Sequence, residues 1–410
     1  MNNTPVANRL HISIFGRRNA GKSTLINALT NQKIAVVSEV AGTTTDPVQK
    51  TMEILPMGPV VVIDTAGYDD TGDLGNLRVE KTYDVLRKTD IAIVVINAED
   101  GITDEDREFI KDVQKKDIPT IVVLNKSDKS DISGEQLNIY KEELGVPLCK
   151  ISAEHKTGIE ELKDLIVKNA KYDESKTTIV GGLVKPRDIV VLVTPIDKSA
   201  PKGRLILPQQ QTIRDILDSD AIAVVTKENG LKDTLNNLTK KPSIVITDSQ
   251  VFSKVAADTP EEIPLTSFSI LFARYKGELK QLVMGIRKIR ELKAGNRVLI
   301  VEGCTHKCEA EDIGRVKIPE WIRKFCGEEI EFEWANGTFY PKKLDKYDLI
   351  VHCGGCMLNK KEMGYRIDAA KESNVAITNY GMLIAYVHGI LPRALKPFPS
   401  VRKMLGYLAP

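Results

Sequence analysis

The feature that most constrains the fold is a short loop near the amino end, set between a strand-like run and a helix-like segment. The apolar run Leu10–Phe15 leads directly into Gly16-Arg17-Arg18-Asn19-Ala20-Gly21-Lys22-Ser23, which matches the pattern GxxxxGK[ST]. Glycines permit a tight path in which successive N–H groups point at phosphate oxygens. Lysine supplies a positive charge for the β- and γ-phosphates, and serine supplies a hydroxyl for Mg²⁺. The sequence therefore predicts an α/β domain that binds a nucleotide.

Three further motifs follow strand-like runs in the order that a guanine-nucleotide site needs. The first is Val61-Val62-Ile63-Asp64-Thr65-Ala66-Gly67, which resembles the DxxG element of G proteins. The resemblance implies that Asp64 lies near Mg²⁺ and that Gly67 is a hinge at the γ-phosphate. The second is Asn125-Lys126-Ser127-Asp128, whose carboxylate can accept hydrogen bonds from N1 and N2 of guanine. The third, Ser152-Ala153, fits a guanine-contacting loop. We therefore expect GTP or GDP, with Mg²⁺, as the ligand.

These motifs assign individual residues to the nucleotide site. The residues assigned to nucleotide binding are Gly16, Asn19, Ala20, Gly21, Lys22, Ser23, Thr24, Asn125, Lys126, Asp128, Ser152 and Ala153. Those assigned to catalysis are Lys22, Asp64 and Gly67, with Ser23 and Asp64 around Mg²⁺; the resemblance of the segment Gly42–Pro47 to switch I of known GTPases adds Thr44 to both sets.

The segment Gly42-Thr43-Thr44-Thr45-Asp46-Pro47 resembles switch I of the tRNA-modification (TrmE) and Era-like GTPases. The resemblance implies Thr44 as the Mg²⁺-binding threonine, with Thr43 as the alternative. Asn19 resembles the asparagine that helps to hold K⁺ in potassium-activated members, where the cation replaces an arginine finger. The alternative is that Asn19 only shapes the loop. Tyr68 stands after Gly67, where a glutamine could orient water. We therefore expect slow hydrolysis that K⁺ accelerates.

Apolar runs alternate with helical patterns along the whole chain, which is typical of α/β domains. The strand-like runs of the first part are Leu10–Phe15, Val60–Asp64, Ile91–Asn97, Thr120–Asn125 and Pro147–Ile151, with helical patterns at Lys22–Thr30 and Ile159–Asn169. The later runs are Asp188–Val193, Ala221–Thr226, Ser243–Thr247, Arg297–Val301, Glu329–Glu333, Leu349–His352 and Val375–Thr378, with a long helical pattern from Pro264 to about Lys293. The polar segment Lys171–Thr178 marks the first boundary, so we expect domains at 1–172, 180–262 and 264–410.

The formal net charge of +2 is too small to steer the whole molecule toward nucleic acid or anionic lipid. No apolar run approaches the roughly 18–20 residues that a membrane helix needs. The amino-terminal MNNTPVANRL lacks the apolar core of a signal peptide. We expect a cytoplasmic protein without a membrane or nucleic-acid partner.

Five of the six cysteines lie after residue 300, and three of them follow apolar runs. Arg297–Val301 leads to Gly303-Cys304-Thr305-His306, and Leu349–Val351 leads to His352-Cys353-Gly354-Gly355-Cys356. Carboxyl ends of parallel strands share one sheet edge, so we expect both cysteine groups to meet there. Cys304, Cys353 and Cys356 suit an iron–sulfur cluster. Alternatives are a zinc site that adds His306, and buried structural cysteines.

The order CxH then HCxxC, behind a TrmE-like domain, resembles the FeFe-hydrogenase maturation GTPase family, HydF, over nearly the whole chain. The resemblance implies a P-loop GTPase domain, a small α/β dimerisation domain and a Rossmann-like α/β cluster-binding domain. It implies that Cys304, Cys353 and Cys356 hold a 4Fe-4S cluster whose fourth iron has an exchangeable ligand. Candidates for that ligand are His306, His352 and Asp188.

The same resemblance implies a homodimeric scaffold that carries the diiron precursor of the hydrogenase active site. Its expected partners are the radical SAM maturases HydE and HydG and apo FeFe-hydrogenase. The competing interpretation is a tRNA-modification or ribosome-assembly GTPase with a structural zinc site. That class predicts a basic face rich in aromatics, and no dense Lys/Arg run with aromatics follows residue 170.

Overall fold

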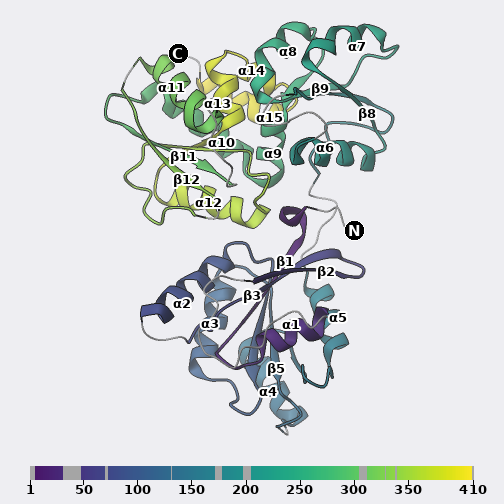
Figure 1. Cartoon of the computed structure of the whole chain (residues 1–410), viewed down its shortest axis with the longest axis vertical. Coiled ribbons are helices and arrows are strands. Elements are labelled where there is room, and N and C mark those ends of the chain that lie inside the picture. Colours follow the sequence, from purple (N-terminus) through teal and green to yellow (C-terminus); the bar gives the residue numbers. More distant parts are fainter. Residues whose placement is uncertain are drawn as a thin grey trace. The chain divides into compact units, whose positions relative to one another are not determined.

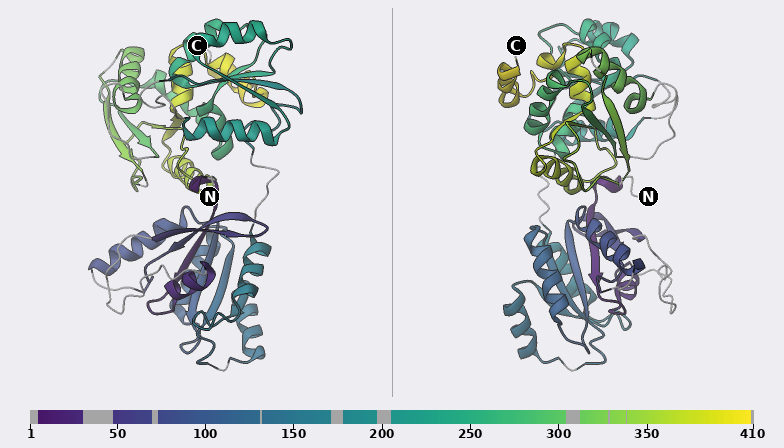
Figure 2. Two further views of the ribbon diagram at one scale, coloured as in Figure 1. Left: turned by 45° about the vertical axis from the view of Figure 1, so that its right-hand side comes forward. Right: turned by 90° about the vertical axis from the view of Figure 1, so that its left-hand side faces the viewer.

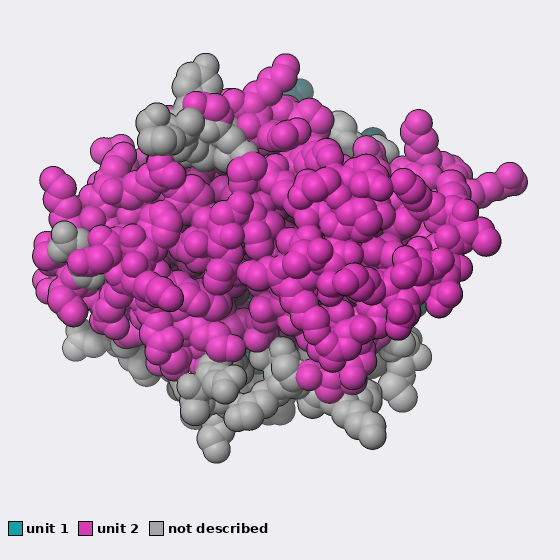
Figure 3. Space-filling view, turned by 90° about the horizontal axis from the view of Figure 1, so that it is seen from above, with its two compact units in different colours: residues 1–173 teal, residues 174–410 magenta. Residues whose placement is uncertain are grey.

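The structure is a computed structural model of the 410-residue chain. It describes residues 5–30, 48–69, 73–130, 132–170, 178–196, 205–303, 312–327, 329–337 and 339–408. The chain divides into two compact units, Met1–Asp173 and Glu174–Pro410, coloured separately in Figure 3. The division falls within the polar segment Lys171–Thr178, where the sequence predicts the first boundary.

The first unit is a six-stranded sheet in the order β2-β3-β1-β4-β5-β6, parallel except for the edge strand β2 (Figure 1). Its strands are β1 (Leu10–Gly16), β2 (Val48–Ile54), β3 (Gly58–Asp64), β4 (Ile91–Asn97), β5 (Thr120–Asn125) and β6 (Leu148–Lys150). Its helices are η1 (Val6–Asn8), α1 (Lys22–Thr30), α2 (Asp73–Leu86), α3 (Asp104–Lys115), α4 (Gly134–Leu144) and α5 (Ile159–Asn169). The apolar runs and helical patterns predicted for this region are confirmed.

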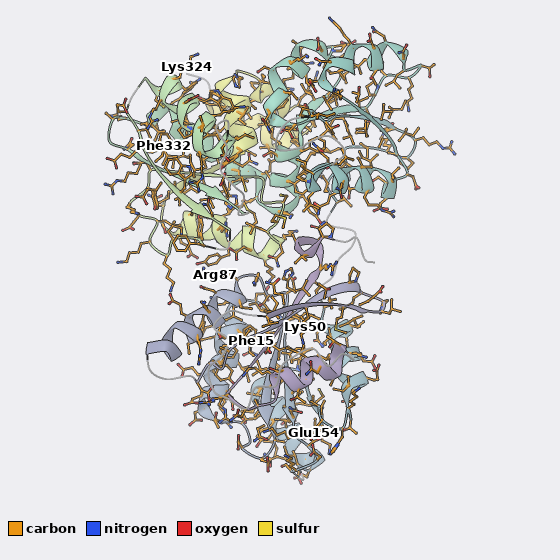
Figure 4. All side chains as sticks on the ribbon, viewed as in Figure 1. Phe15, Lys50, Arg87, Glu154, Lys324 and Phe332 are labelled. Carbon is orange, nitrogen blue, oxygen red and sulfur yellow. The ribbon has the colours of Figure 1, made fainter. Side chains whose placement is uncertain are left out.

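Continuous apolar runs form the central strands because helices cover both faces of the sheet. On one face α1 and α5 bury Leu25, Ile26 and Leu162 against the sheet. On the other face α2 and α3 form a second core, in which Phe15 of β1, labelled in Figure 4, packs on Phe109 with ring centroids 5.3 Å apart. The carboxyl ends of the parallel strands lie together at one edge of the sheet, and the motif loops begin there.

The second unit holds two four-stranded parallel sheets (Figure 2). The first sheet has the order β10-β9-β7-β8, from β7 (Ile189–Val193), β8 (Ile222–Thr226), β9 (Ile244–Thr247) and β10 (Leu265–Ser267). Its helical segments are α6 (Leu207–Asp218), η3 (Glu228–Gly230), α7 (Leu231–Asn237), η4 (Ser249–Val251) and α8 (Phe252–Asp258).

The second sheet has the order β12-β11-β13-β14, from β11 (Arg297–Glu302), β12 (Glu331–Asn336), β13 (Leu349–His352) and β14 (Ala376–Asn379). The helical segments that follow β11 are η6 (Ile313–Lys317), α11 (Ile318–Cys326), α12 (Lys360–Glu372), α13 (Tyr380–Val387), α14 (Leu391–Ala394), α15 (Pro399–Arg402) and η7 (Lys403–Leu408). Residues of both sheets belong to one continuous apolar core, which explains why they form a single compact unit.

The segment Pro264–Lys293 differs from the single long helix that its sequence pattern predicts. It contains β10, α9 (Phe268–Lys276), α10 (Leu279–Gly285) and η5 (Ile286–Glu291). The helix ends at Gly277, where a Cβ would lie 2.8 Å from Cδ1 of Ile367 and 3.2 Å from the carbonyl oxygen of Ala273. Because β10 pairs with β9, the structure joins residues 265–267 to the sheet of the middle block rather than to the block predicted from 264.

Within the described part of the chain, none of the helices is both long and apolar enough to cross a membrane.

Candidate functional site

All the described nucleotide-motif residues lie at the carboxyl ends of strands in the first unit. The phosphate-loop motif joins β1 to α1, and Asp64 ends β3. Asn125 ends β5, and Ser152 comes shortly after β6. In an open parallel sheet this edge is where ligands bind. Thr44 and the rest of the predicted switch I lie outside the described residues.

The ammonium group of Lys22 is folded onto the phosphate-binding loop. Its Nζ donates to the carbonyl oxygens of Gly16 at 2.7 Å and Arg17 at 2.8 Å. Asn19 in the same loop has a left-handed backbone with φ of 60°. The loop therefore holds a positive charge at the mouth of the strand–helix turn, where a phosphate would contact it.

Ser23 and Asp64 form the predicted Mg²⁺ side of the site. The hydroxyl of Ser23 donates to Asp64 Oδ2 at 2.8 Å. Asp64 Oδ1 is buried and has no hydrogen-bond partner among the described residues. Burial raises the pKa of Asp64, and the Ser23 hydrogen bond and Lys22 act in the opposite direction. A buried, unpartnered carboxylate oxygen beside a hydroxyl is a donor set that suits a hard cation such as Mg²⁺.

Asn125 ties the phosphate loop to the guanine-binding loops. Its Nδ2 donates to the carbonyl oxygen of Ala20 at 3.0 Å, and its Oδ1 accepts from the N–H of Ala153 at 3.0 Å. Gly21 makes this approach possible, since a Cβ there would lie 2.2 Å from Asn125 Nδ2 and its φ is +93°. A hydrogen bond from Ser152 lowers the pKa of Asp128. Asp128 is therefore kept as a carboxylate, the form that accepts hydrogen bonds from guanine.

The residue after Gly67 points into the first unit instead of orienting water. The hydroxyl of Tyr68 donates to Asp106 Oδ1, and its ring stacks on Phe109 with centroids 4.3 Å apart. Asp106 also pairs with Arg17 of the phosphate loop at 3.2 Å. Sequence reasoning missed this arrangement, because nothing in the sequence around Asp106 distinguishes it from other helix-start acids.

Gly67 itself stands close to the phosphate loop. A Cβ at Gly67 would lie 2.6 Å from Asp69 Oδ1 and 3.0 Å from the backbone nitrogen of Arg18. The carboxylate of Asp69 accepts from that Arg18 N–H at 2.8 Å. The predicted hinge glycine thus occupies a place that a larger residue would not fit.

The second candidate site lies at the carboxyl ends of β11 and β13, which pair in parallel with Val301 opposite His352. Gly303, which precedes the first predicted cysteine ligand, donates its N–H to Cys353 Sγ at 3.1 Å. Gly355 donates its N–H to the same sulfur at 3.3 Å. The two cysteine-bearing loops therefore start side by side, as the sequence predicts. Cys304 and His306 lie outside the described residues.

Among the described residues, no three His, Cys, Asp or Glu side chains gather as a metal site. The described part supplies two of the three predicted cysteine ligands, Cys353 and Cys356, both as free thiols. Burial raises the pKa of Cys353 to about 11, and the N–H groups of Gly303 and Gly355 oppose that shift. Burial also raises the pKa of Cys356, against the opposing charge of Lys276. The two N–H groups that donate to Cys353 Sγ and the charge of Lys276 near Cys356 fit thiolate ligation of a cluster.

Lys276 was not predicted as part of this site. It ends α9, and its side chain is buried, with 2% exposed. Its Nζ donates to the carbonyl oxygens of Gly355 at 3.1 Å, Cys356 at 2.9 Å and Leu358 at 2.6 Å. Burial lowers the pKa of Lys276 to about 8, while the neighbouring thiols raise it.

Both ring nitrogens of His352 are already hydrogen-bonded within the protein. Nδ1 lies 2.8 Å from the carbonyl oxygen of Cys353, and Nε2 lies 3.1 Å from Nη1 of Arg366. A carbonyl only accepts and a guanidinium only donates, so the ring is neutral with its proton on Nδ1. Burial and Arg366 lower the pKa of His352 to about 3. In this structure His352 has no nitrogen left for a metal, and it positions the Cys353 backbone instead.

Asp188, the other described candidate for the fourth ligand, precedes the amino end of β7. Its carboxylate accepts from the N–H of Lys185 at 3.0 Å and pairs with Lys240 at 3.5 Å. This is the amino edge of its sheet, whereas Cys353 follows the carboxyl end of a strand in the other sheet. The structure gives Asp188 a turn-capping role.

Comparison with known families divides the chain in the same order. The model described as 50S ribosome-binding GTPase matches residues 11–126. The model for the hydrogen maturase F dimerization domain matches residues 179–277, and that for the hydrogen maturase F tetramerization domain matches residues 280–397.

Curated relatives match only part of the chain. The tRNA modification GTPase MnmE of Aquifex aeolicus is 38% identical over 167 residues, which cover 40% of this chain and 36% of the relative. GTPase Der of Bartonella henselae is 39% identical over 164 residues, covering 39% and 34%. The chain thus spans about a third of the length of these relatives.

Among solved structures, Aquifex aeolicus Era bound to GDP and AlF₄⁻ is similar with 29% identity and a TM-score of 0.37, covering 40% of this chain and 57% of that one. The first unit is a P-loop GTPase domain. Because two hydrogen maturase F models match successive parts of the second unit behind it, the chain belongs to the hydrogen maturase F (HydF) family.

Proposed function

We propose that this chain is a GTP-hydrolysing scaffold that carries a 4Fe-4S cluster and the diiron precursor of the FeFe-hydrogenase active site. It would receive the precursor from the radical SAM maturases HydE and HydG and deliver it to apo-hydrogenase. The family membership supports the hydrogenase-maturation role. The P-loop GTPase domain supports GTP and Mg²⁺ as ligands.

The observation that carries the cluster proposal is the contact between Gly303 and Cys353. The N–H of Gly303 lies 3.1 Å from Cys353 Sγ, so the residue before Cys304 already touches the second cysteine loop. Cys304, Cys353 and Cys356 would hold the cluster as thiolates. When bound, the cluster supplies an iron with an exchangeable coordination position, which a carrier can use to hold a labile ligand. With both nitrogens of His352 engaged, His306 stays a candidate for that position.

Hydrolysis would depend on Lys22 at the phosphates, Ser23, Thr44 and Asp64 around Mg²⁺, and Gly67 as the hinge. The hydroxyl of Tyr68 is engaged by Asp106 and does not orient water, which supports a slow intrinsic rate. A K⁺ held by Asn19 would supply the missing positive charge in the transition state. The family's dimerization and tetramerization domains support self-association. The expected homodimer would be one stage in the assembly of a larger oligomer.

We further propose that GTP turnover gates the exchange of partners through movement of the switch loops. Lys22→Ala removes the phosphate-binding ammonium and leaves the cysteine site of the other unit intact. Hydrogenase maturation with this variant should fall together with GTP hydrolysis. Normal maturation by a variant that no longer hydrolyses GTP would refute the coupling.

The scaffold role is tested by hydrogenase maturation with Cys353→Ala. The matched control is Cys149→Ala, which removes a buried thiol in the core of the GTPase domain. Apo-hydrogenase incubated with the Cys353 variant should gain no activity, while GTP hydrolysis persists. Equal maturation by the Cys353 variant and the control would contradict the proposal.

A tRNA-modification or ribosome-assembly GTPase is the second candidate, favoured by the match of residues 11–126 and by the MnmE relatives. That similarity covers about 40% of the chain. This candidate predicts one zinc bound at the cysteine loops and no cluster after reconstitution. Counting iron and zinc on one sample separates the two.

A further inference from the structure

A buried lysine forms part of the cysteine site although it comes from a distant part of the chain. Lys276 is the last residue of α9, the helix that follows β10 of the other sheet in the same unit. Its side chain is 2% exposed, and its ammonium lies within the turn that follows Cys353. A buried lysine is rare unless a partner offsets its charge.

The contacts of Lys276 define its charge state without reference to its pKa. The carbonyl oxygens of Gly355, Cys356 and Leu358 surround Nζ at 2.6–3.1 Å. A carbonyl can only accept, so three such contacts use three N–H donors. A neutral amine has two N–H groups, whereas an ammonium has three. The geometry therefore points to a positively charged Lys276.

Those three carbonyls also fix the shape of the loop that carries two predicted ligands. They belong to the stretch from Gly355 to Leu358, which contains Cys356 and immediately follows Cys353. Phe272, one turn back on α9, covers the ammonium with its ring centroid 5.6 Å from Nζ. The charge is thus shielded from water, and the low dielectric around it strengthens its electrostatic interaction with the thiols of Cys356 and Cys353.

We propose that Lys276 is the positioning and charge-compensating residue of the cysteine site, an inference that rests on the proposed cluster. A four-iron cluster held by thiolates is negatively charged overall, and reduction adds one more negative charge. A fixed buried cation favours the reduced state and keeps the CxxC loop in its ligating shape. Loss of the cation should therefore make the midpoint potential more negative and make the cluster easier to extract.

The test compares Lys276→Met with Lys276→Arg in the full-length chain after anaerobic reconstitution. Lys360→Met is the matched control, because it removes an exposed lysine four residues after Cys356. Two quantities are measured. The first is the midpoint potential of the cluster, from a redox titration monitored by electron paramagnetic resonance. The second is the rate at which an iron chelator removes the cluster. GTP hydrolysis reports that the other unit is unchanged.

We expect Lys276→Met to lower the midpoint potential and to weaken cluster retention about 10- to 100-fold, the usual effect of losing a residue that orients metal ligands. Lys276→Arg should restore the potential, since it keeps the charge, and Lys360→Met should match the wild type. A Lys276→Met protein with unchanged potential and extraction rate overturns the inference. If Lys276→Met fails to fold, Lys276→Gln replaces it, with the same expected loss.

A purely structural role predicts a different pattern, in which extraction is faster but the potential of the retained cluster is unchanged; that pattern also overturns the charge assignment. Failure of the wild-type chain to take up any cluster would contradict the proposed function itself. The two failures are therefore distinguished by the wild-type sample.

Discussion

Replacing Arg366 by methionine should destabilise the second unit strongly, because this guanidinium is fully buried behind the cysteine loop. Its Nε donates to Glu362 at 2.9 Å, its Nη1 to His352 at 3.1 Å and its Nη2 to the carbonyl oxygen of Gly337 at 2.9 Å. Its Cζ also lies 5.2 Å from the centroid of the Tyr340 ring. One side chain therefore satisfies a buried carboxylate, a buried imidazole and a half-buried carbonyl.

The magnitude follows from what the substitution leaves behind. Methionine fills much of the volume but leaves Glu362, which is 7% exposed, as a buried carboxylate without its cation. Breaking one side of a buried ion pair costs about 3–5 kcal/mol. The unpaired carbonyl and imidazole each add about 1–3 kcal/mol before the loop relaxes. We therefore expect Arg366→Met to lower the free energy of unfolding by about 5 kcal/mol or more.

Urea unfolding followed by tryptophan fluorescence measures this change. The chain has two tryptophans, and both Trp321 in α11 and Trp334 in β12 belong to the second unit. Arg323→Met is the control, since Arg323 pairs with Glu329 at 3.9 Å on the surface and its loss should cost about 1 kcal/mol or less.

A double variant separates loss of pairing from loss of packing. Arg366→Met with Glu362→Met removes both charges and should recover much of the lost stability, since apolar pairs replace buried ion pairs at little cost. A single variant within about 1 kcal/mol of wild type would refute the reasoning. So would a double variant less stable than the single one.

Three further predictions concern the GTPase domain. Burial lowers the pKa of His11 to about 4 from an ordinary 6.5, so the unfolded chain takes up the proton first as pH falls. The free energy of unfolding of the first unit should fall by about 2 kcal/mol between pH 7 and pH 5. Pulse proteolysis in urea measures this fall, which should be smaller in His11→Gln. An equal pH dependence of stability in the variant and the wild type would contradict the prediction. Asn125→Ala breaks the hydrogen bonds to Ala20 and Ala153, which together contribute about 2 kcal/mol. Binding of fluorescent GDP should therefore weaken at least about tenfold. An unchanged Kd would count against a role of Asn125 in linking the two loops. Asp128→Asn places an amide donor where guanine needs an acceptor, so competition assays should find weaker GDP binding and tighter xanthosine diphosphate binding, and retained guanine preference would exclude Asp128 from base recognition.

The GTPase domain could be predicted from sequence because each of its motifs carries its own local context. A continuous apolar run that ends in a loop with polar ligand residues recurs at Gly16, Asp64 and Asn125, and parallel strands bring such ends together. The strand β2 was not predicted, since it is a largely exposed edge strand with the polar sequence VQKTMEI.

For the cysteine site, the sequence predicted only that the two cysteine-bearing loops lie close together, and not which other side chains contact them. Residue type alone left His352 as a possible metal ligand, because its hydrogen bonds to Cys353 and Arg366 depend on elements far apart in the sequence. Arg366 and Lys276 have the same sequence signature as solvated helix residues, so burial of their charges was invisible before folding. The break at Gly277 was likewise hidden, because apolar residues keep a helical spacing on both sides of it.

The central claim is that the two cysteine loops of this chain hold a four-iron cluster. The most direct test is electron paramagnetic resonance on anaerobically reconstituted, dithionite-reduced protein, with iron and zinc counted on the same sample. We expect a reduced four-iron signal that disappears in Cys353→Ala and persists in Cys149→Ala. Stoichiometric zinc with no such signal would contradict the claim and leave a GTPase with a structural metal site.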